Sequence, residues 1–287
     1  MQGNRKMSDH HDTHVFTRDR WVEHPQGRIF SRVWSSTNDS PATFQVAPIV
    51  LFHDSLGCVD LWRDFPGELC AATRRPVIAY DRLGFGRSGA RTDRPALDFI
   101  ADEAKTYFPH VREQLGFQRF IALGHSVGGG MAVNGAAAFP TDCEALITES
   151  AQAFPEDRTL NSIAAAKEQF KDETQAQRLA KYHGDKARWV LDAWIENWLH
   201  PEFASWSLAS VLPRVTSPVL AIHGIHDEYG STRHPEIIGQ LCAGPSRVEI
   251  LADTYHVPHR ERPGIVLDLV SKFVASLQPN EPVARAA

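Results

Sequence analysis

The sequence predicts an α/β protein with a mostly parallel, doubly wound sheet and a helical insertion. Short apolar runs typical of strands alternate with segments whose apolar residues recur at helical spacing. The strand-like runs are apolar almost throughout, as in parallel strands that helices cover on both faces. Between residues 152 and 211 the alternation stops, and the chain is charged and helical in pattern. These observations give an α/β core interrupted by one helical segment.

The elements follow in a regular order. Two strand-like segments before residue 47 predict an antiparallel hairpin at one edge of the sheet. Further strands are predicted at 47–54, 76–81, 119–124, 143–149, 217–224 and 246–252, and helices at 61–69, 98–115, 127–139, 234–242 and 263–277. Pro109 is expected to kink the helix over 98–115, and Gly116 to end it. We expect a core over 1–151 and 212–287, with 1–14 a disordered leader, and a helical cap or lid over 152–211.

Composition excludes several classes of function. The 287 residues are 43% hydrophobic and carry a net charge of -5, and the 30 Lys and Arg form no dense run. This charge disfavours nucleic acid and anionic membranes as partners. The four cysteines lack a C-x-x-C pair, so we expect reduced thiols, no metal and no cofactor. The N-terminus has no apolar stretch of signal-peptide length, and no run approaches the ~18 apolar residues of a membrane span, so a cytoplasmic protein is expected.

Residues 124–128, GHSVG, form a G-x-S-x-G motif between a predicted strand and a predicted helix. A serine on so sharp a turn requires neighbours without bulk, which Gly124 and Gly128 supply. The turn also directs the helix N-terminus toward an oxyanion forming beside Ser126. We therefore expect Ser126 to be a nucleophile, although a glycine-rich helix start with an incidental serine has the same pattern.

A serine hydroxyl needs a base, and the base needs a carboxylate that orients it. Asp227 and His256 follow the two strands after the insertion, so both are expected at the sheet edge that carries Ser126. Glu149 at another strand end is a second choice for the acid. His259 and His226 are weaker choices for the base.

A metal-dependent alternative is also open. It would use four histidines at or after the ends of the strands predicted at 217–224 and 246–252, namely His223, His226, His256 and His259.

The chain resembles the α/β-hydrolase family from about residue 20 to 277. The resemblance rests on the segments HDSLG (53–57), DRLGFGRSG (81–89), GHSVGG (124–129), GIHD (224–227) and HVPHRERP (256–263). It implies a fold of this family with a serine esterase-like site. The family pattern places an acidic residue and a proline after the catalytic histidine, and Glu261 and Pro263 fit His256. Its G-x-x-D pattern selects Asp227 over Glu149.

The resemblance also implies an oxyanion hole made by the backbone N–H groups of Ser55 and Val127. Asp54 stands where the family usually has glycine. A carboxylate directed into the hole would oppose negative charge, so we expect the Asp54 side chain to point away. Each N–H donor should contribute ~3 kcal/mol of transition-state stabilisation.

The insertion carries an aromatic stripe. Leu191, Trp194 and Trp198 lie at helical spacing within 186–200. The stripe fits packing against the core and equally fits an aromatic roof over the serine, with Trp194 and Trp198 as substrate-binding residues.

The sequence thus predicts a serine hydrolase that cleaves small to medium carboxylic esters through an acyl-enzyme on Ser126. A serine nucleophile excludes the aspartate-based dehalogenase and epoxide hydrolase chemistries that the resemblance would otherwise allow. Carbon–carbon bond hydrolysis, lactonase or thioesterase activity on the same triad remains an alternative, as does a non-catalytic ligand-binding protein. The expected partner is a small ester-like molecule, and the sequence leaves the oligomeric state open.

Overall fold

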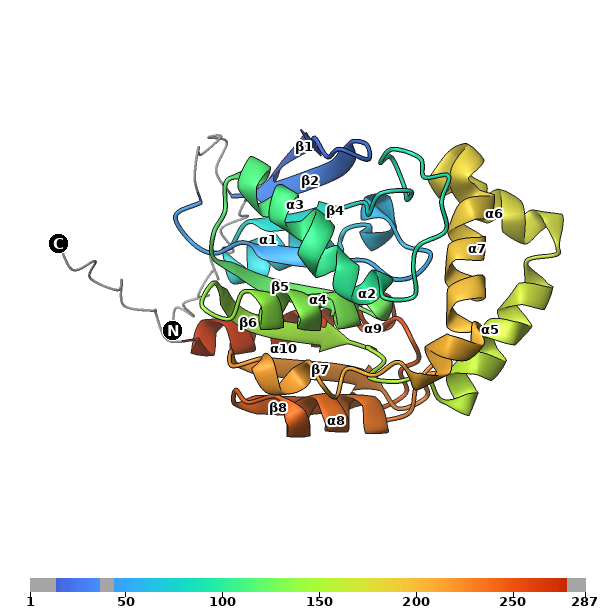
Figure 1. Cartoon of the computed structure of the whole chain (residues 1–287). Coiled ribbons are helices and arrows are strands. Elements are labelled where there is room, and N and C mark those ends of the chain that lie inside the picture. Colours follow the sequence, from blue (N-terminus) through green and yellow to red (C-terminus); the bar gives the residue numbers. More distant parts are fainter. Residues whose placement is uncertain (1–13, 37–43, 278–287) are drawn as a thin grey trace, which may run out of the picture.

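A computed structural model describes residues 14–36 and 44–277. The predicted leader therefore lies outside the described residues, apart from His14. One eight-stranded sheet runs through the molecule in the order β1-β2-β4-β3-β5-β6-β7-β8 (Figure 1). Its strands are β1 (Phe16–Val22), β2 (Ile29–Ser35), β3 (Ile49–Phe52), β4 (Val77–Tyr80), β5 (Phe120–His125), β6 (Cys143–Glu149), β7 (Val219–Gly224) and β8 (Ser246–Leu251).

The pairing of the strands confirms the predicted hairpin and the parallel core. β1 pairs antiparallel with β2, and β2 pairs antiparallel with β4, whereas the pairs from β4 to β8 are all parallel. Every residue of β3, β4, β5 and β7 is buried. Strands buried on both faces are apolar almost throughout, which is why these runs lacked the alternation of a half-exposed sheet.

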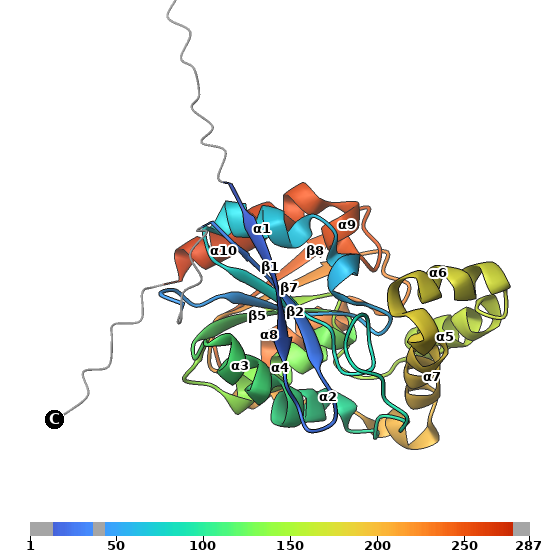
Figure 2. The same ribbon diagram turned by 90° about the horizontal axis from the view of Figure 1, so that it is seen from above.

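Helices cover both faces of the sheet, as seen from above in Figure 2. On one face lie α2 (Phe99–Asp102), α3 (Phe108–Leu115), α4 (Val127–Ala138) and α8 (Arg233–Leu241), and on the other α1 (Phe65–Thr73), α9 (Pro258–Glu261) and α10 (Pro263–Ser276). Among residues 14–36 and 44–277, none of the helices is long and apolar enough to cross a membrane.

The helix predicted over 98–115 contains a π-helical segment. This segment, Glu103–Tyr107, joins α2 to α3, and Pro109 lies in the first turn of α3. Proline lacks the N–H group that continues an α-helical ladder, and its ring crowds the carbonyl four residues earlier. Asp102 and Phe108 on either side of the segment keep helical φ and ψ, and the Phe108 N–H bonds to the Glu103 carbonyl, so the helix continues through a π-bulge just before the proline. Gly116 ends α3 with a φ of 77°, as predicted.

The insertion contains three helices, α5 (Asp157–Gln169), α6 (Glu173–His183) and α7 (Ala187–Trp198). They lie beyond the carboxyl ends of the parallel strands (Figure 1). His183 joins them to the core, because its Nδ1 accepts from the Gly86 N–H and its Nε2 donates to the Leu56 carbonyl, both at 2.9 Å. Lys186 Nζ also donates to the Gly86 carbonyl, at 2.7 Å. The insertion is thus held next to the loop after β3, where the oxyanion hole is expected.

Candidate active site

Ser126 lies on a sharp turn between β5 and α4. Its backbone has a φ of 56° and a ψ of -127°, and a positive φ costs about 1–3 kcal/mol in a residue with a side chain. A Cβ on Gly124 would lie 2.1 Å from the Gly128 carbonyl oxygen, and one on Gly128 would lie 2.1 Å from that of Phe52. Such distances are impossible for real atoms. The two glycines therefore permit the crossing of strand and helix that holds Ser126 in its strained turn.

A chain of hydrogen bonds runs from Asp227 through His256 to Ser126. His256 Nε2 lies 3.0 Å from Ser126 Oγ, and His256 Nδ1 lies 2.8 and 2.9 Å from the two carboxylate oxygens of Asp227. Asp227 is fully buried in the loop after β7, and His256 is 9% exposed in the loop after β8. The structure thus brings together the three side chains that the sequence proposed as a triad.

Asp227 is kept in its ionised form. Burial alone would raise the pKa of Asp227, but the charge and hydrogen bonds of His256 lower it, and so do the charge of His223 and the N–H of Tyr229. The balance holds the Asp227 pKa below its usual range. The Tyr229 N–H donates to Oδ1 at 2.7 Å and the Gly230 N–H at 3.2 Å. An ionised, fixed carboxylate of this kind can orient an imidazole and stabilise its charged form.

The competing residues lie elsewhere. Glu149, the second choice for the acid, accepts from the backbone N–H of His259 and lies 2.9 Å from Nδ1 of the same residue. Both side chains are buried, so these two residues form a separate pair. His226 is exposed and its ring contacts Tyr255. In the described part of the chain, no group of three or more His, Cys, Asp or Glu side chains is arranged to hold a metal ion.

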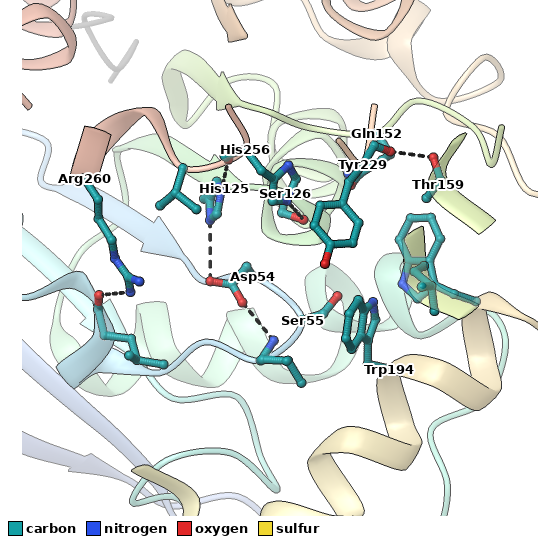
Figure 3. A pocket seen from close by; sticks show the side chains of 15 residues that line it. Asp54, Ser55, His125, Ser126, Gln152, Thr159, Trp194, Tyr229, His256 and Arg260 are labelled. Carbon is teal, nitrogen blue, oxygen red and sulfur yellow. Dashed lines mark hydrogen bonds and ion pairs between the residues drawn. The ribbon is translucent and has the colours of Figure 1, made fainter. Parts of the chain in front are cut away.

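The expected oxyanion donors flank Ser126. Val127 is the first residue of α4, so its N–H has no acceptor within the helix, and Ser55 lines the pocket that contains Ser126. The Asp54 carboxylate is turned toward His125 and the N–H of Leu56, although it still lines the same pocket (Figure 3). Asp54 therefore contributes a polar side chain to the lining of the site.

The pocket over Ser126 has a volume of about 220 Å³. Trp194 and Trp198 of α7 both line it, as the aromatic stripe suggested, and both are also buried against their neighbours. Further lining residues were not found by sequence reasoning: Gln152, Thr159, Ile163, Tyr229 and Arg260. Their only sequence signal was position, since Gln152 and Tyr229 closely follow the ends of β6 and β7.

Tyr229 is the most prominent of these additional residues. Its ring centre lies 4.7 Å from that of His256, and Figure 3 shows its hydroxyl directed into the pocket toward Trp194 and Ser55. Burial raises the pKa of Tyr229 to about 12, so the hydroxyl is neutral and can donate a hydrogen bond. Gln152 is 3% exposed, and its Oε1 has no hydrogen-bond partner among the described residues.

Comparison with known proteins decides the family. The family model described as alpha/beta hydrolase fold matches residues 47–187, which include the strands β3 to β6 and the Ser126 turn. The chain belongs to the α/β-hydrolase family. Membership in the α/β-hydrolase family supports hydrolase activity in general and leaves the substrate open.

Solved α/β-hydrolase structures share the fold over most of this chain. The 2-hydroxy-6-oxo-6-phenylhexa-2,4-dienoate hydrolase from Rhodococcus sp. strain RHA1 superposes with a TM-score of 0.76 at 14% identity and covers 92% of this chain and all of its own. An alpha/beta hydrolase fold protein from Chitinophaga pinensis has a TM-score of 0.69 at 18% identity, covering 90% of this chain and 97% of that one. At these identities the likeness shows the fold alone.

Curated relatives of this α/β-hydrolase match over a shorter region. The human 1-acylglycerol-3-phosphate O-acyltransferase ABHD5 is 39% identical over 113 residues, which cover 38% of this chain and 31% of that protein. The bovine (lyso)-N-acylphosphatidylethanolamine lipase is 34% identical over 125 residues, covering 44% of this chain and 36% of the relative. The match thus spans about a third of each relative's length.

Proposed function

We propose that this protein is a serine hydrolase that cleaves small to medium carboxylic esters through an acyl-enzyme on Ser126. The hydrogen-bond chain Asp227–His256–Ser126 carries the proposal, because it joins a carboxylate, an imidazole and a hydroxyl in the order that activates the hydroxyl. The bovine relative named as a lipase supports ester cleavage. The proposed substrate is a small ester-like molecule. The cytoplasmic location expected from the sequence stays a prediction.

The first half of the reaction forms the acyl-enzyme. His256 Nε2 takes the Ser126 proton while Oγ bonds to the ester carbonyl carbon. The N–H groups of Ser55 and Val127 hold the resulting oxyanion. His256 then gives its proton to the departing alkoxide as the ester C–O bond breaks, and Asp227 stabilises the imidazolium between these two transfers.

The second half releases the acid. His256 removes a proton from a water molecule, whose oxygen bonds to the acyl carbon. The tetrahedral intermediate expels Ser126 Oγ, which recovers the proton from His256. An alcohol in place of water would give acyl transfer, the activity in the name of the human relative.

The size of the pocket supports small to medium substrates. Its volume of about 220 Å³ lies below the ≈ 300–1,000 Å³ of sites for drug-sized ligands. We assign the roof of this pocket to Trp194 and Trp198, and the cap role to residues 152–211.

A panel of p-nitrophenyl esters from acetate to decanoate tests this function. We expect turnover of the shorter esters and labelling by an active-site fluorophosphonate. A butyryl thioester, a lactone and a vinylogous diketone, assayed in parallel, test the alternatives on the same triad. A protein that takes no fluorophosphonate and turns over none of these compounds would be a ligand-binding member of the family instead.

A further inference from the structure

His125, directly before Ser126, is buried and both of its ring nitrogens face acceptors. Nε2 lies 2.8 Å from the carbonyl oxygen of His256, so Nε2 carries a proton, because a carbonyl only accepts. Nδ1 lies 3.5 Å from Asp54 Oδ2, which is long for a hydrogen bond but is an ion-pair distance. A neutral ring would present the Nδ1 lone pair to a carboxylate. Only the doubly protonated ring has a proton for each acceptor.

The charges around His125 favour its cationic form. Two carboxylates act on the ring, Asp54 of the loop after β3 by direct contact and Glu149 at the end of β6 through its charge. The rings of His256 and His259 lie 5.1 and 5.0 Å from it, centre to centre, and Trp62 supplies an uncharged wall.

The balance of these effects can be given a direction. Burial disfavours the charge on His125, but the contact with Asp54, the charge of Glu149 and the His256 carbonyl outweigh it, and the pKa of His125 is raised. The pKa of Asp54 is held far below its usual range, because the contacts with His125, His53 and the Leu56 N–H outweigh its burial.

We propose that His125 is a positioning residue held as an imidazolium, which neutralises Asp54 beside the oxyanion hole and fixes the loop that carries His256. The proposal rests on the proposed ester hydrolysis, since it assigns a task at the same site. Asp54 directly precedes Ser55, one of the proposed oxyanion donors, and lines the same pocket as Ser126. An uncompensated carboxylate there would oppose the negative charge that develops on the substrate. His125 supplies the compensating charge, and its bond to the His256 carbonyl joins this charge to the position of the base.

The protonation state can be measured without turnover. In the Ser126→Ala variant, ¹⁵N spectra of the histidine side chains distinguish an imidazolium from either neutral form. The His125 signal among the 14 histidines is assigned by its loss in His125→Gln, or by selective labelling if that variant does not fold. We expect a doubly protonated His125 at pH 7.5, about one unit above the ordinary histidine pKa. Asp54→Asn should shift its titration to lower pH. A neutral His125 at pH 7.5 would overturn the proposal.

A double-mutant cycle then tests the effect on the reaction. His125→Gln should lower kcat about 10- to 100-fold with little change in KM, because the oxyanion exists only in the transition state. In an Asp54→Asn background the same change should cost less than about threefold. Asp60→Asn is the matched control, since Asp60 is an exposed carboxylate paired with Arg32, and it should leave the cost of His125→Gln undiminished.

The two proposals fail in different ways. An equal cost of His125→Gln with and without the Asp54 charge would show a merely structural histidine. A wild-type protein that cleaves no ester would defeat the proposed function, while the ¹⁵N titration would still report whether His125 is charged.

Discussion

His256 Nε2 and Ser126 Oγ lie 3.0 Å apart although the residues are 130 positions apart in the chain. The contact joins the turn after β5 to the loop after β8, across the intervening strands β6 and β7. It depends on the sheet being formed from β5 to β8. Substitutions at these two residues therefore report on chemistry, provided that the fold is checked independently.

Replacing Ser126 with alanine should abolish ester turnover while the protein stays folded. If Ser126 is the nucleophile, kcat should fall by about 10⁴–10⁶, and a fluorophosphonate should label the wild type only. The Tm should not decrease, since alanine fits the same turn. Labelling that survives in Ser126→Ala would reject the assignment.

Histidine substitutions should separate the base from its neighbour. His256→Ala should cost nearly as much activity as Ser126→Ala. His259→Ala should act mainly on stability, because it removes the side-chain contact from the buried Glu149 carboxylate while the backbone N–H contact remains, at about 1–3 kcal/mol. Urea unfolding and ester assays on both variants check this, and greater activity loss per folded molecule in His259→Ala would mean that the base was misassigned.

Substitutions of the two carboxylates should separate the catalytic acid, Asp227, from Glu149. Asp227→Asn should lower kcat strongly, since an amide neither orients the imidazole correctly nor stabilises its charge. Glu149→Gln should leave most of the activity of the folded protein, because Glu149 contacts His259 and not His256. The reverse order would move the acid to Glu149.

Trp194→Ala should lower activity selectively for bulky esters. Trp194 lines the pocket near Tyr229, with ring centres 6.1 Å apart. Losing about 50 Å² of apolar contact with a ligand is worth about 1 kcal/mol, or about fivefold in kcat/KM. An acetate ester should hardly change.

Trp198→Ala provides the comparison. Trp198 packs against Phe203 and Trp206 as well as lining the pocket, so its loss should lower the Tm more than that of Trp194. If Trp194→Ala reduces kcat/KM equally for short and bulky esters and lowers the Tm, the roof assignment is wrong.

Stability should fall as the pH drops from about 6.5 toward 4, in part through His234 of α8. Its Nδ1 accepts from the Ala153 N–H at 3.2 Å, so a proton there would face another donor. Burial, which outweighs the opposing charge of Glu156, lowers the pKa of His234 to about 4. In this window the unfolded chain binds the proton and the folded chain does not. Acid therefore favours unfolding, by at most about 3 kcal/mol.

The measurement is urea unfolding at pH 7 and pH 5. His234→Gln should have a lower stability at pH 7 and a smaller difference between the two pH values than the wild type. An unchanged difference would assign the acid sensitivity to other groups.

The sheet and the triad were predictable because they depend on local patterns. Ser126 and Asp227 each follow a buried, apolar strand, and His256 follows the edge strand β8, so the parallel topology places all three at one edge of the sheet. The pairing of Glu149 with His259 was not predictable, because it depends on how α9 packs over the end of β6. The pocket position of Arg260 likewise depends on where the short helix α9 lies, and that of Gln152 follows from a loop conformation that carries no periodicity.

The helix near Pro109 gives a second example. The sequence predicted a kink at Pro109, whereas the structure has a π-helical segment over Glu103–Tyr107, and which of these forms depends on what packs against the helix. Asp54 is a third example. The sequence segment HDSLG already showed an aspartate where the family usually has glycine. Its partner His125 could be identified only from the structure, in which β3 and β5 lie side by side.

The α5–α7 segment leaves the core after β6 and returns before β7, and its two ends meet where the Leu208 N–H donates to the Ala153 carbonyl at 2.8 Å. Its two attachment points are therefore neighbours in space. Grafting a segment of another length between these ends would leave the strand pairing in place but would remove the hydrogen bond from Arg158 to the Asp227 carbonyl. The pocket takes its lining from both stretches, with Trp194 and Trp198 in the segment and Tyr229 in the core. Libraries confined to residues 152–211 would therefore vary one wall of the proposed site while Ser126, Asp227 and His256 stay constant.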